Sequence, residues 1–305
     1  MCQRLCIVGV GLIGGSLALA LRRAGGVGEI VGCGRNAEQL ALAQSLGVID
    51  RYDTDPARAA AGADMVVLAV PVLAMEAVLG ELAAGLGADT VLTDVGSTKG
   101  NVAAAAARSL GKRLGRFVPG HPIAGTERSG VQHAFPELYA GRRVILTPLE
   151  QTDPAATARV RALWEAAGAQ VSEMGVAEHD AVLAATSHLP HLLAYALVDT
   201  LARMDERQAI FRYAAGGFRD FTRIASSDPQ MWHDICLANR EALLEVLGQF
   251  QGDLQRLEAA LRAGDGEVLM EVFGRAKRAR DAFVDSNGAA APPQAAAPAA
   301  QDERE

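Results

Sequence analysis

The sequence predicts an α/β fold in which a doubly wound, mostly parallel sheet is followed by an all-α domain. Three observations lead to this prediction. Short apolar runs alternate with helical patterns through the first half of the chain, a glycine-rich turn follows the first run, and the strand pattern stops after Gly175. Such alternation is typical of parallel strands joined by right-handed helical crossovers.

Continuous runs of Val, Ile and Leu predict strands that are covered on both faces of a sheet. These runs are residues 5–10, 29–33, 65–70, 90–95, 116–120, 143–148 and 169–174. Ala- and Leu-rich stretches between them predict helices, and these are residues 16–24, 37–47 and 154–167. We expect the first domain to cover residues 1–175.

The second half of the chain shows helical patterns only. Residues 178–204 are apolar nearly all round, which predicts a helix buried among others, and Pro190 must kink or restart it. Asp228 and Pro229 predict a helix start, as the N-cap and the first helical residue. A 3.6-residue apolar period then runs through residues 232–250.

The helical domain is expected to cover residues 176–285. Its apolar helices need more cover than roughly 110 residues supply, so we expect a homodimer formed through them. Residues 286–305 are rich in Ala and Pro and charged at the end, which predicts a disordered tail.

Composition and charge narrow the class of protein. Half of the 305 residues are hydrophobic and 21% are charged, which is typical of globular chains. The net charge of −7 argues against a nucleic-acid partner or an anionic membrane surface. The longest apolar stretch, residues 65–79, is interrupted by Pro71 and Glu76 and is too short to span a bilayer. Four cysteines without a CxxC pair, and no signal peptide, indicate a cytoplasmic protein.

The turn after the first predicted strand contains Gly9, Gly11 and Gly14 in the GxGxxG spacing. Gly9 permits a tight turn, Gly11 lets the backbone approach a pyrophosphate, and Gly14 lets the helix pack on the strand. Free N–H groups at the helix N-terminus then face the anion. Glycines that serve packing alone are the alternative, but the flanking strand and helix favour a Rossmann-type dinucleotide site.

The end of the second predicted strand bears on the choice of cofactor. An NAD site usually carries an acidic residue there for the ribose hydroxyls, but the sequence is Cys33-Gly34-Arg35-Asn36. Arg35 could pair with a 2′-phosphate, so we favour NADP over NAD, and a solvated surface arginine is the alternative. The predicted cofactor-binding residues are Gly9, Gly11, Leu12, Ile13, Gly14, Arg35, Val70 and Pro71.

Three further clusters are dense in polar residues. TDVGSTK (93–99) and GHPIAGTE (120–127) follow predicted strands, where open α/β sheets place their ligands. The third cluster lies in the helical half and consists of SHLPH (187–191), GGFRDFTRIA (216–225) and MWH (231–233).

With the glycine turn, these motifs resemble the prephenate/arogenate (cyclohexadienyl) dehydrogenase family of tyrosine biosynthesis, in order, over about residues 5–285. The resemblance implies a Rossmann domain joined to a helical dimerisation domain, with the active site between them. It also implies oxidative decarboxylation of prephenate to 4-hydroxyphenylpyruvate or of arogenate to tyrosine. The sequence leaves open which of the two substrates is used.

His121 matches the catalytic histidine of the family, and histidine suits the role of base because it titrates near working pH. A loop histidine bonded to backbone is the alternative. Ser97 would hold the same substrate hydroxyl or orient His121, or else cap a helix at residues 98–111. Lys99 is given no role, as a solvated residue of that helix's first turn.

Arg223 is expected to clamp a substrate carboxylate, because a guanidinium pairs with one through two hydrogen bonds; an ion pair with Asp220 is the alternative. His191 matches the family's second substrate-contacting histidine, and His188 is expected to be structural. The two lie at i and i+3, but Pro190 between them and the lack of a matched carboxylate argue against a metal site.

Thr126 and Glu127 resemble the family's side-chain-binding and gating residues, although Glu127 could instead cap the turn. Trp232 either reaches the neighbouring subunit's site or is a core residue. His133, His179 and His233 are given no role. Tyrosine resembles the product, so feedback inhibition by tyrosine is a further hypothesis.

Two other classes of protein compete with this interpretation. One is a β-hydroxyacid-type dehydrogenase, which usually uses a lysine on a helix of its second domain; beyond residue 112 this chain has only Lys277. The other is a non-catalytic, NAD(P)-sensing regulatory dimer, in which His121, His191 and Arg223 would be unnecessary.

Overall fold

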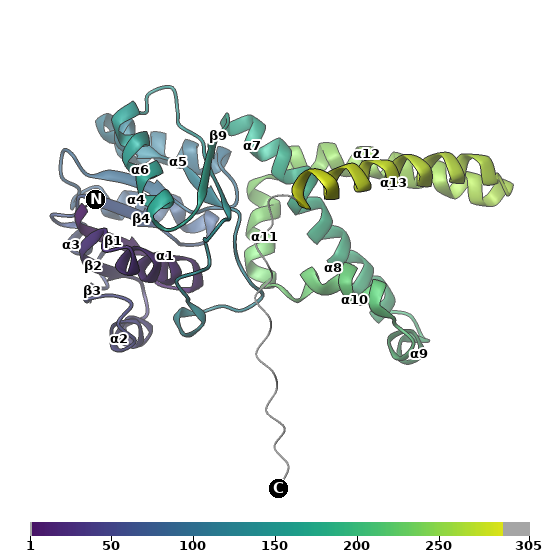
Figure 1. Ribbon diagram of the computed structural model, residues 1–305, viewed down its shortest axis with the longest axis horizontal. Helices are drawn as coiled ribbons and strands as arrows, with labels where there is room; N and C mark the ends of the chain where they lie inside the picture. The colour runs from purple at the N-terminus through teal and green to yellow at the C-terminus, as the bar shows by residue number, and fades with distance from the viewer. Residues whose placement is uncertain (1, 289–305) are drawn as a thin grey trace, which may run out of the picture. The chain divides into compact units, whose positions relative to one another are not determined.

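The computed structural model describes residues 2–288, and its largest sheet has six parallel strands in the order β3-β2-β1-β4-β5-β6 (Figure 1). The strands are β1 (Cys2–Val8), β2 (Val27–Cys33), β3 (Arg51–Asp53), β4 (Met65–Leu68), β5 (Val91–Asp94) and β6 (Phe117–Val118). The order reverses between β1 and β4, the switch point where such sheets bind ligands. The predicted fold class is therefore confirmed.

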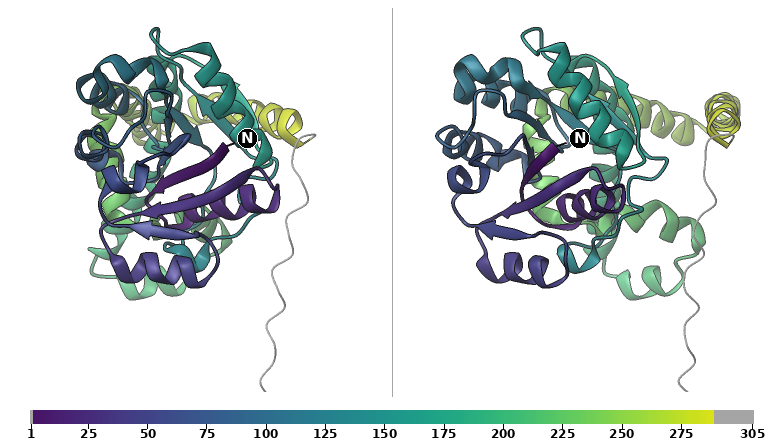
Figure 2. Two further views of the ribbon diagram at one scale, coloured as in Figure 1. Left: turned by 90° about the vertical axis from the view of Figure 1, so that its left-hand side faces the viewer. Right: turned by 60° about the vertical axis from the view of Figure 1, so that its left-hand side comes forward.

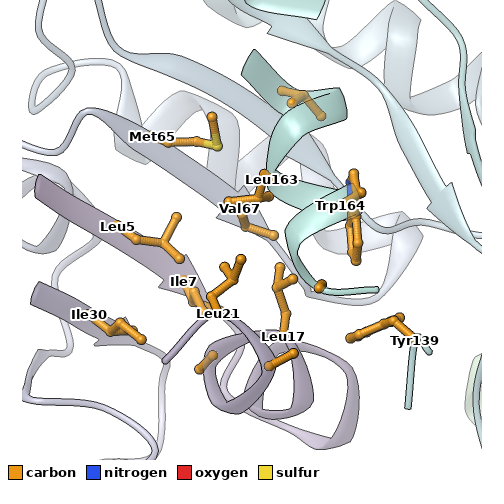
Figure 3. Close-up of a cluster of buried hydrophobic side chains, with 14 of the residues drawn as sticks. Leu5, Ile7, Leu17, Leu21, Ile30, Met65, Val67, Tyr139, Leu163 and Trp164 are labelled. Atoms are coloured by element: carbon orange, nitrogen blue, oxygen red, sulfur yellow. The ribbon is translucent and has the colours of Figure 1, made fainter. Parts of the chain in front are cut away.

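Helices cover both faces of this sheet (Figure 2). Side chains alternate along β1, so Leu5 and Ile7 enter one core while Cys6 and Val8 enter the other. Figure 3 shows the first core, where Leu17 and other side chains pack under the sheet. It is covered by α1 (Leu12–Arg23), α2 (Ala37–Ser45) and α6 (Pro154–Ala166), and the second by α3 (Pro56–Ala60), α4 (Met75–Leu82) and α5 (Gly100–Leu110).

A second, three-stranded sheet follows, with β7 (Gly120–Pro122) antiparallel to β8 (Arg143–Leu146) and β8 parallel to β9 (Gln170–Glu173). The sequence predicted one strand over 116–120, but the structure divides it at Pro119 between β6 and β7. Proline has no N–H to donate to a ladder, so pairing breaks there. His121 consequently lies in β7, just beyond the carboxyl edge of the large sheet.

Between Val176 and Gly288 the regular elements of the chain are all helical, as predicted. The elements are α7 (Val176–Leu183), a π-helical turn (Ala184–His188), α8 (Leu189–Ala202), α9 (Arg207–Arg212), α10 (Gly216–Thr222), a 3-10 turn (Arg223–Ser226), α11 (Pro229–Ala238), α12 (Arg240–Ala263) and α13 (Gly266–Gly288). Asp228 caps α11 by accepting a hydrogen bond from the Met231 N–H, with Pro229 in the first turn. Pro190 restarts the helix as α8 after the π-helical turn.

Two expectations for the helical half need correction. The run 178–204 is not buried in the single chain, because much of α8 is half-exposed and only Leu189 and Ala194 of that helix are buried. The predicted tail does not begin at residue 286, because α13 continues to Gly288; residues 289–305 lie outside the described residues.

The described chain divides into two compact units, Met1–Gly248 and the remainder from Gln249. Residues 176–248 thus belong to the same unit as the sheets, and the boundary at residue 175 stays a prediction. Val176–Ala202 is long and apolar enough to cross a membrane by length and composition alone, with 28% of its most apolar part buried. However, His179 and His188 in this run are buried and hydrogen-bonded inside the first unit, which anchors the run in the folded domain.

Candidate active site

The glycine turn between β1 and α1 has the geometry that a dinucleotide needs. Gly9 has a φ of +98°, and a Cβ there would lie 2.2 Å from the Ala69 carbonyl oxygen. A Cβ on Gly14 would lie 2.2 Å from the Gly9 carbonyl oxygen, so helix and strand touch at this point. A Cβ on Gly11 would meet nothing within 4 Å. Since no side chain caps α1, its first N–H groups remain available to an anion.

The remaining predicted cofactor residues surround this turn. Leu12 and Ile13 form the first turn of α1, and Tyr139 donates a hydrogen bond to the Ile13 carbonyl at 2.6 Å. Val70 follows β4, and its Cγ1 would lie 3.2 Å from a Cβ on Gly9. Pro71 is exposed beside it. The residues present therefore fit a bound dinucleotide.

Arg35 is exposed after β2, and among residues 2–288 the structure gives it no ion-pair partner. Asn36 beside it caps α2. The acid at the end of the adjacent strand β3, Asp53, is paired with Arg58, whose hydrogen bonds lower the pKa of Asp53 to about 2. The carboxylate of Asp53 is thus already paired with the guanidinium of Arg58, whereas the exposed guanidinium of Arg35 is accessible to an anionic group of a ligand.

A fully buried ion pair joins Lys99 to Asp94 at the carboxyl end of β5. Lys99 Nζ also donates to the Gly120 carbonyl at 2.8 Å, while Asp94 accepts from the N–H groups of Gly96 and Gly120. Burial lowers the pKa of Lys99, and the Asp94 carboxylate opposes that shift. The expectation of a solvated Lys99 is therefore wrong: the pair tethers the residue that precedes His121.

Replacing Lys99 by Met is expected to lower the free energy of unfolding by about 3–5 kcal/mol, because it leaves Asp94 buried without its cation. Urea unfolding of Lys99→Met and wild type measures the difference. Lys112→Met is the matched control, since Lys112 is exposed, and we expect a change of at most ~0.5 kcal/mol there. Equal losses in the two variants would contradict the prediction.

His121 is 8% exposed, and its Nδ1 lies 2.9 Å from Nε2 of His179 on α7. Nδ1 of His179 lies 2.8 Å from Oδ1 of Asp180. The two rings meet edge to face, with centroids 5.1 Å apart. Burial and the nearby Lys99 lower the pKa of His121 well below 6.5, with smaller contributions from His179 and His188. A neutral imidazole therefore sits at the carboxyl edge of the sheet.

Asp180 also connects α7 to α5. Its Oδ1 accepts from the Lys99 N–H at 2.8 Å, and its Oδ2 accepts from the Gly100 N–H at 2.7 Å. Helix α5 begins at Gly100 without a side-chain cap of its own. The alternative of Ser97 as cap is therefore wrong, because the carboxylate of Asp180 fills that role. Ser97 is half-buried in the loop between β5 and α5.

His188 and His191 have different surroundings. His188 is 1% exposed, and its Nδ1 lies 3.0 Å from Nδ2 of Asn239, so it is part of the folded core as expected. Nδ1 of His191 donates to the Ser187 carbonyl at 2.8 Å, and its ring stacks on Trp232 with centroids 3.5 Å apart. Trp232 is buried among side chains of its own subunit, which matches the core alternative.

Arg223 forms an ion pair with Glu127, not with Asp220. The turn that contains Arg223 packs against α8, the helix that contains His191. Burial lowers the pKa of His191, and the positive charge of Arg223 lowers it further. Glu127, Thr126 and Arg128 line a pocket of about 450 Å³ with residues 132–135. The loop that follows His121 thus reaches the predicted carboxylate clamp in the same compact unit.

The comparisons with known proteins cover most of the chain and agree with one another. The family model of the nucleotide-binding domain of prephenate dehydrogenase matches residues 17–173, and that of the prephenate dehydrogenase dimerization domain matches residues 176–275. This chain belongs to the prephenate dehydrogenase family. The resemblance drawn from the motifs is confirmed, and neither the β-hydroxyacid interpretation nor the regulatory one is needed.

Individual relatives of this prephenate dehydrogenase family member cover nearly all of it. The cyclohexadienyl dehydrogenase of Zymomonas mobilis is 38% identical over 280 residues, which are 91% of this chain and 95% of the relative. The prephenate dehydrogenase of Bacillus subtilis is 38% identical over 92% of this chain and 76% of its own length.

Two solved structures show the same fold. Prephenate dehydrogenase from Aquifex aeolicus, in complex with hydroxyphenyl propionate and NAD+, has a TM-score of 0.86 and 41% identity over 92% of this chain and 98% of that one. Synechocystis arogenate dehydrogenase has a TM-score of 0.78 and 29% identity over 92% of this chain and all of the other.

Three residues of the candidate site were not predicted from the sequence of this prephenate dehydrogenase family member: Lys99, His179 and Asp180. His179 and Asp180 open an otherwise apolar helical run, and a polar pair in such a place needs partners when it is buried. That was the available signal. Lys99 stands five residues after Asp94, and no local pattern indicates that both are buried.

Proposed function

We propose that this chain catalyses the oxidative decarboxylation of prephenate, of arogenate or of both, with hydride transfer to a nicotinamide cofactor. The observation that carries the proposal is the buried His121 at the carboxyl edge of the sheet, 2.9 Å from His179, with Arg223 paired to Glu127 of the loop that follows it. The chemistry of the substrates matches this arrangement. Each has a ring hydroxyl at the carbon that gives up hydride and a carboxylate at the opposite ring carbon.

The side chains divide the work of the reaction. His121 accepts the hydroxyl proton as the carbon–oxygen double bond forms, and Ser97 holds the same hydroxyl. Arg223 binds a carboxylate of the substrate in place of Glu127, and His191 and Thr126 contact the rest of it. The bound nicotinamide, held by the glycine turn, supplies the hydride acceptor. Aromatisation then drives the loss of carbon dioxide.

The function is tested by mixing the purified protein with prephenate or arogenate and NAD+ or NADP+. Formation of the reduced nicotinamide is followed by its absorbance. Turnover on either substrate supports the proposal, and its ratio on the two identifies the preferred one. No reduction with any of the four combinations would overturn it.

We also propose a preference for NADP+ over NAD+. Support comes from Arg35, which is exposed and has no ion-pair partner among residues 2–288, and from the absence of an acid at the end of β2, while the relative from Aquifex aeolicus was solved with NAD+. Arg35→Ala is expected to raise KM for NADP+ by about 10-fold or more, because a charge-assisted hydrogen bond contributes roughly 1.5–3 kcal/mol. KM for NAD+ should stay nearly constant. A wild-type enzyme that prefers NAD+ would contradict the proposal.

A homodimer and a regulatory ligand complete the proposal. The dimerization-domain match and the half-exposed apolar side chains of α8 support assembly of two copies through the helical half.

Unpaired Cys2, Cys6, Cys33 and Cys236 agree with a cytoplasmic enzyme. Tyrosine resembles the product and would compete for the same site; activity that does not change at high tyrosine concentration would dismiss that part.

A further inference from the structure

We propose that His179 and Asp180 are positioning residues that set the tautomer of His121, so that its Nε2 carries the free electron pair. This inference rests on the proposed role of His121 as base. It assigns a task to two residues that the motifs left without one. The three side chains form a continuous line from α7 to β7, joined at 2.8 and 2.9 Å.

The direction of each hydrogen bond follows from Asp180. As a carboxylate it can only accept, so Nδ1 of His179 must carry a proton. With its proton on Nδ1, the imidazole of His179 presents the electron pair of Nε2 to His121, and the proton between the two rings belongs to Nδ1 of His121. Nε2 of His121 is left free, which is the form that a base needs. If both hydrogen bonds ran in the opposite direction, the unprotonated Nδ1 of His179 would face the carboxylate of Asp180, and two electron pairs would repel each other.

Asp180 is held as an anion despite its burial. Burial raises its pKa, but the hydrogen bonds from His179 and from the N–H groups of Lys99 and Gly100 outweigh that and lower it. Two of these donors lie at the N-terminus of α5, where the helix dipole favours a negative charge. The carboxylate is therefore fixed in position and in charge by the helix that follows the Ser97 loop.

The same line serves the proton transfer. The substrate O–H bond breaks, its electron pair forms the carbon–oxygen double bond, and the proton goes to Nε2 of His121. The C–H bond of the same carbon breaks in this step, and its electron pair would leave as hydride to a bound nicotinamide. The resulting imidazolium keeps its Nδ1–H on Nε2 of His179, with the Asp180 anion behind it. No proton has to leave His179 or Asp180 during the step.

The test compares His179→Gln with His179→Leu. The glutamine Oε1 can accept the Nδ1–H of His121 as Nε2 of His179 does, whereas leucine cannot. We expect kcat of His179→Leu to fall about 100-fold, at the lower end of what a general base contributes. His179→Gln should stay within about 10-fold of wild type, and KM should hardly change, because neither variant touches the substrate.

The tautomer itself is measured by nitrogen NMR on full-length protein labelled with 15N-histidine, with His121→Asn used to assign the signal. Wild type and His179→Gln are expected to carry the His121 proton on Nδ1, and His179→Leu on Nε2. His233→Leu is the matched control. His233 makes the same 2.8 Å contact to the next residue, Asp234, but its side chain is 58% exposed, so its loss should change neither kcat nor the His121 signal.

Three results would overturn the inference. The first is an NMR signal that shows the proton of wild-type His121 on Nε2. This measurement is made on the wild-type protein, so it does not depend on the folding of a variant. The second is an unchanged tautomer in His179→Leu. The third is an equal loss of kcat in His179→Gln and His179→Leu. Failure of the proposed function would look different, since the wild-type protein would then reduce no cofactor with prephenate or arogenate, while the NMR signal of His121 would still report its tautomer.

Discussion

His121→Asn is expected to lower kcat by roughly 10²–10⁴, the usual contribution of a general base. Asparagine keeps a similar polar surface near His179 but offers no basic nitrogen to the ring hydroxyl. Because His121 acts on the proton and not on the substrate carboxylates, KM should remain similar. Steady-state kinetics on both substrates provide the measurement, and thermal unfolding of the variant shows whether the fold is intact.

The pH dependence gives an independent check on the same residue. His121 faces Lys99, His179 and His188, and burial together with these groups keeps its pKa well below the ordinary 6.5. A base with a lowered pKa stays unprotonated to more acidic pH, so the acidic limb of kcat/KM should lie below pH 6.5. A limb at or above 6.5 would contradict the assignment of His121 as the base.

Arg223→Ala is expected to raise KM by on the order of 10- to 100-fold with little change in kcat. A charged hydrogen-bonded contact contributes roughly 1.5–3 kcal/mol, and this one is made in the ground state and the transition state alike. Arg223→Lys should recover only part of the loss, because an ammonium lacks the planar fork.

Arg219→Ala serves as the matched control for Arg223→Ala. Arg219 is an exposed arginine on the neighbouring helix α10, and its removal should leave KM unchanged. If Arg223→Ala lowered kcat at constant KM while His121→Asn raised KM, the two roles would have to be exchanged.

Much of the fold could be predicted from local patterns, because most strands of the doubly covered sheet are continuous apolar runs. The glycine turn was predictable because its spacing lies within six residues, although the close approach of Ala69 to Gly9 is visible only in the structure. β3 was missed because its three residues, Arg51 to Asp53, contain no apolar run. β7 was missed because Pro119 divides a single apolar stretch between two sheets, and only the tertiary pairing reveals this.

The site was harder to predict because its contacts are distant in sequence. His121 and His179 are 58 residues apart, and Asp180 meets the start of α5 from 81 residues away. The spacing of residues along the chain does not predict contacts between side chains so far apart in sequence. Lys99 shows the same limit: its place in a first helical turn suggests solvent, yet its side chain turns inward to a carboxylate at the end of a strand.

The pairing of β7 has a consequence for how substrate preference could change. The main chain of His121 is in register with Ile145 of β8, and its neighbour Gly120 is tied to Asp94 and Lys99. The proposed proton acceptor thus lies on a paired strand whose neighbouring residue is hydrogen-bonded to a buried ion pair, while Arg223 and Glu127 lie in exposed segments. Substitutions in the exposed segments around Arg223 and Glu127 could therefore change the recognition of a keto or an amino side chain without disturbing the position of His121.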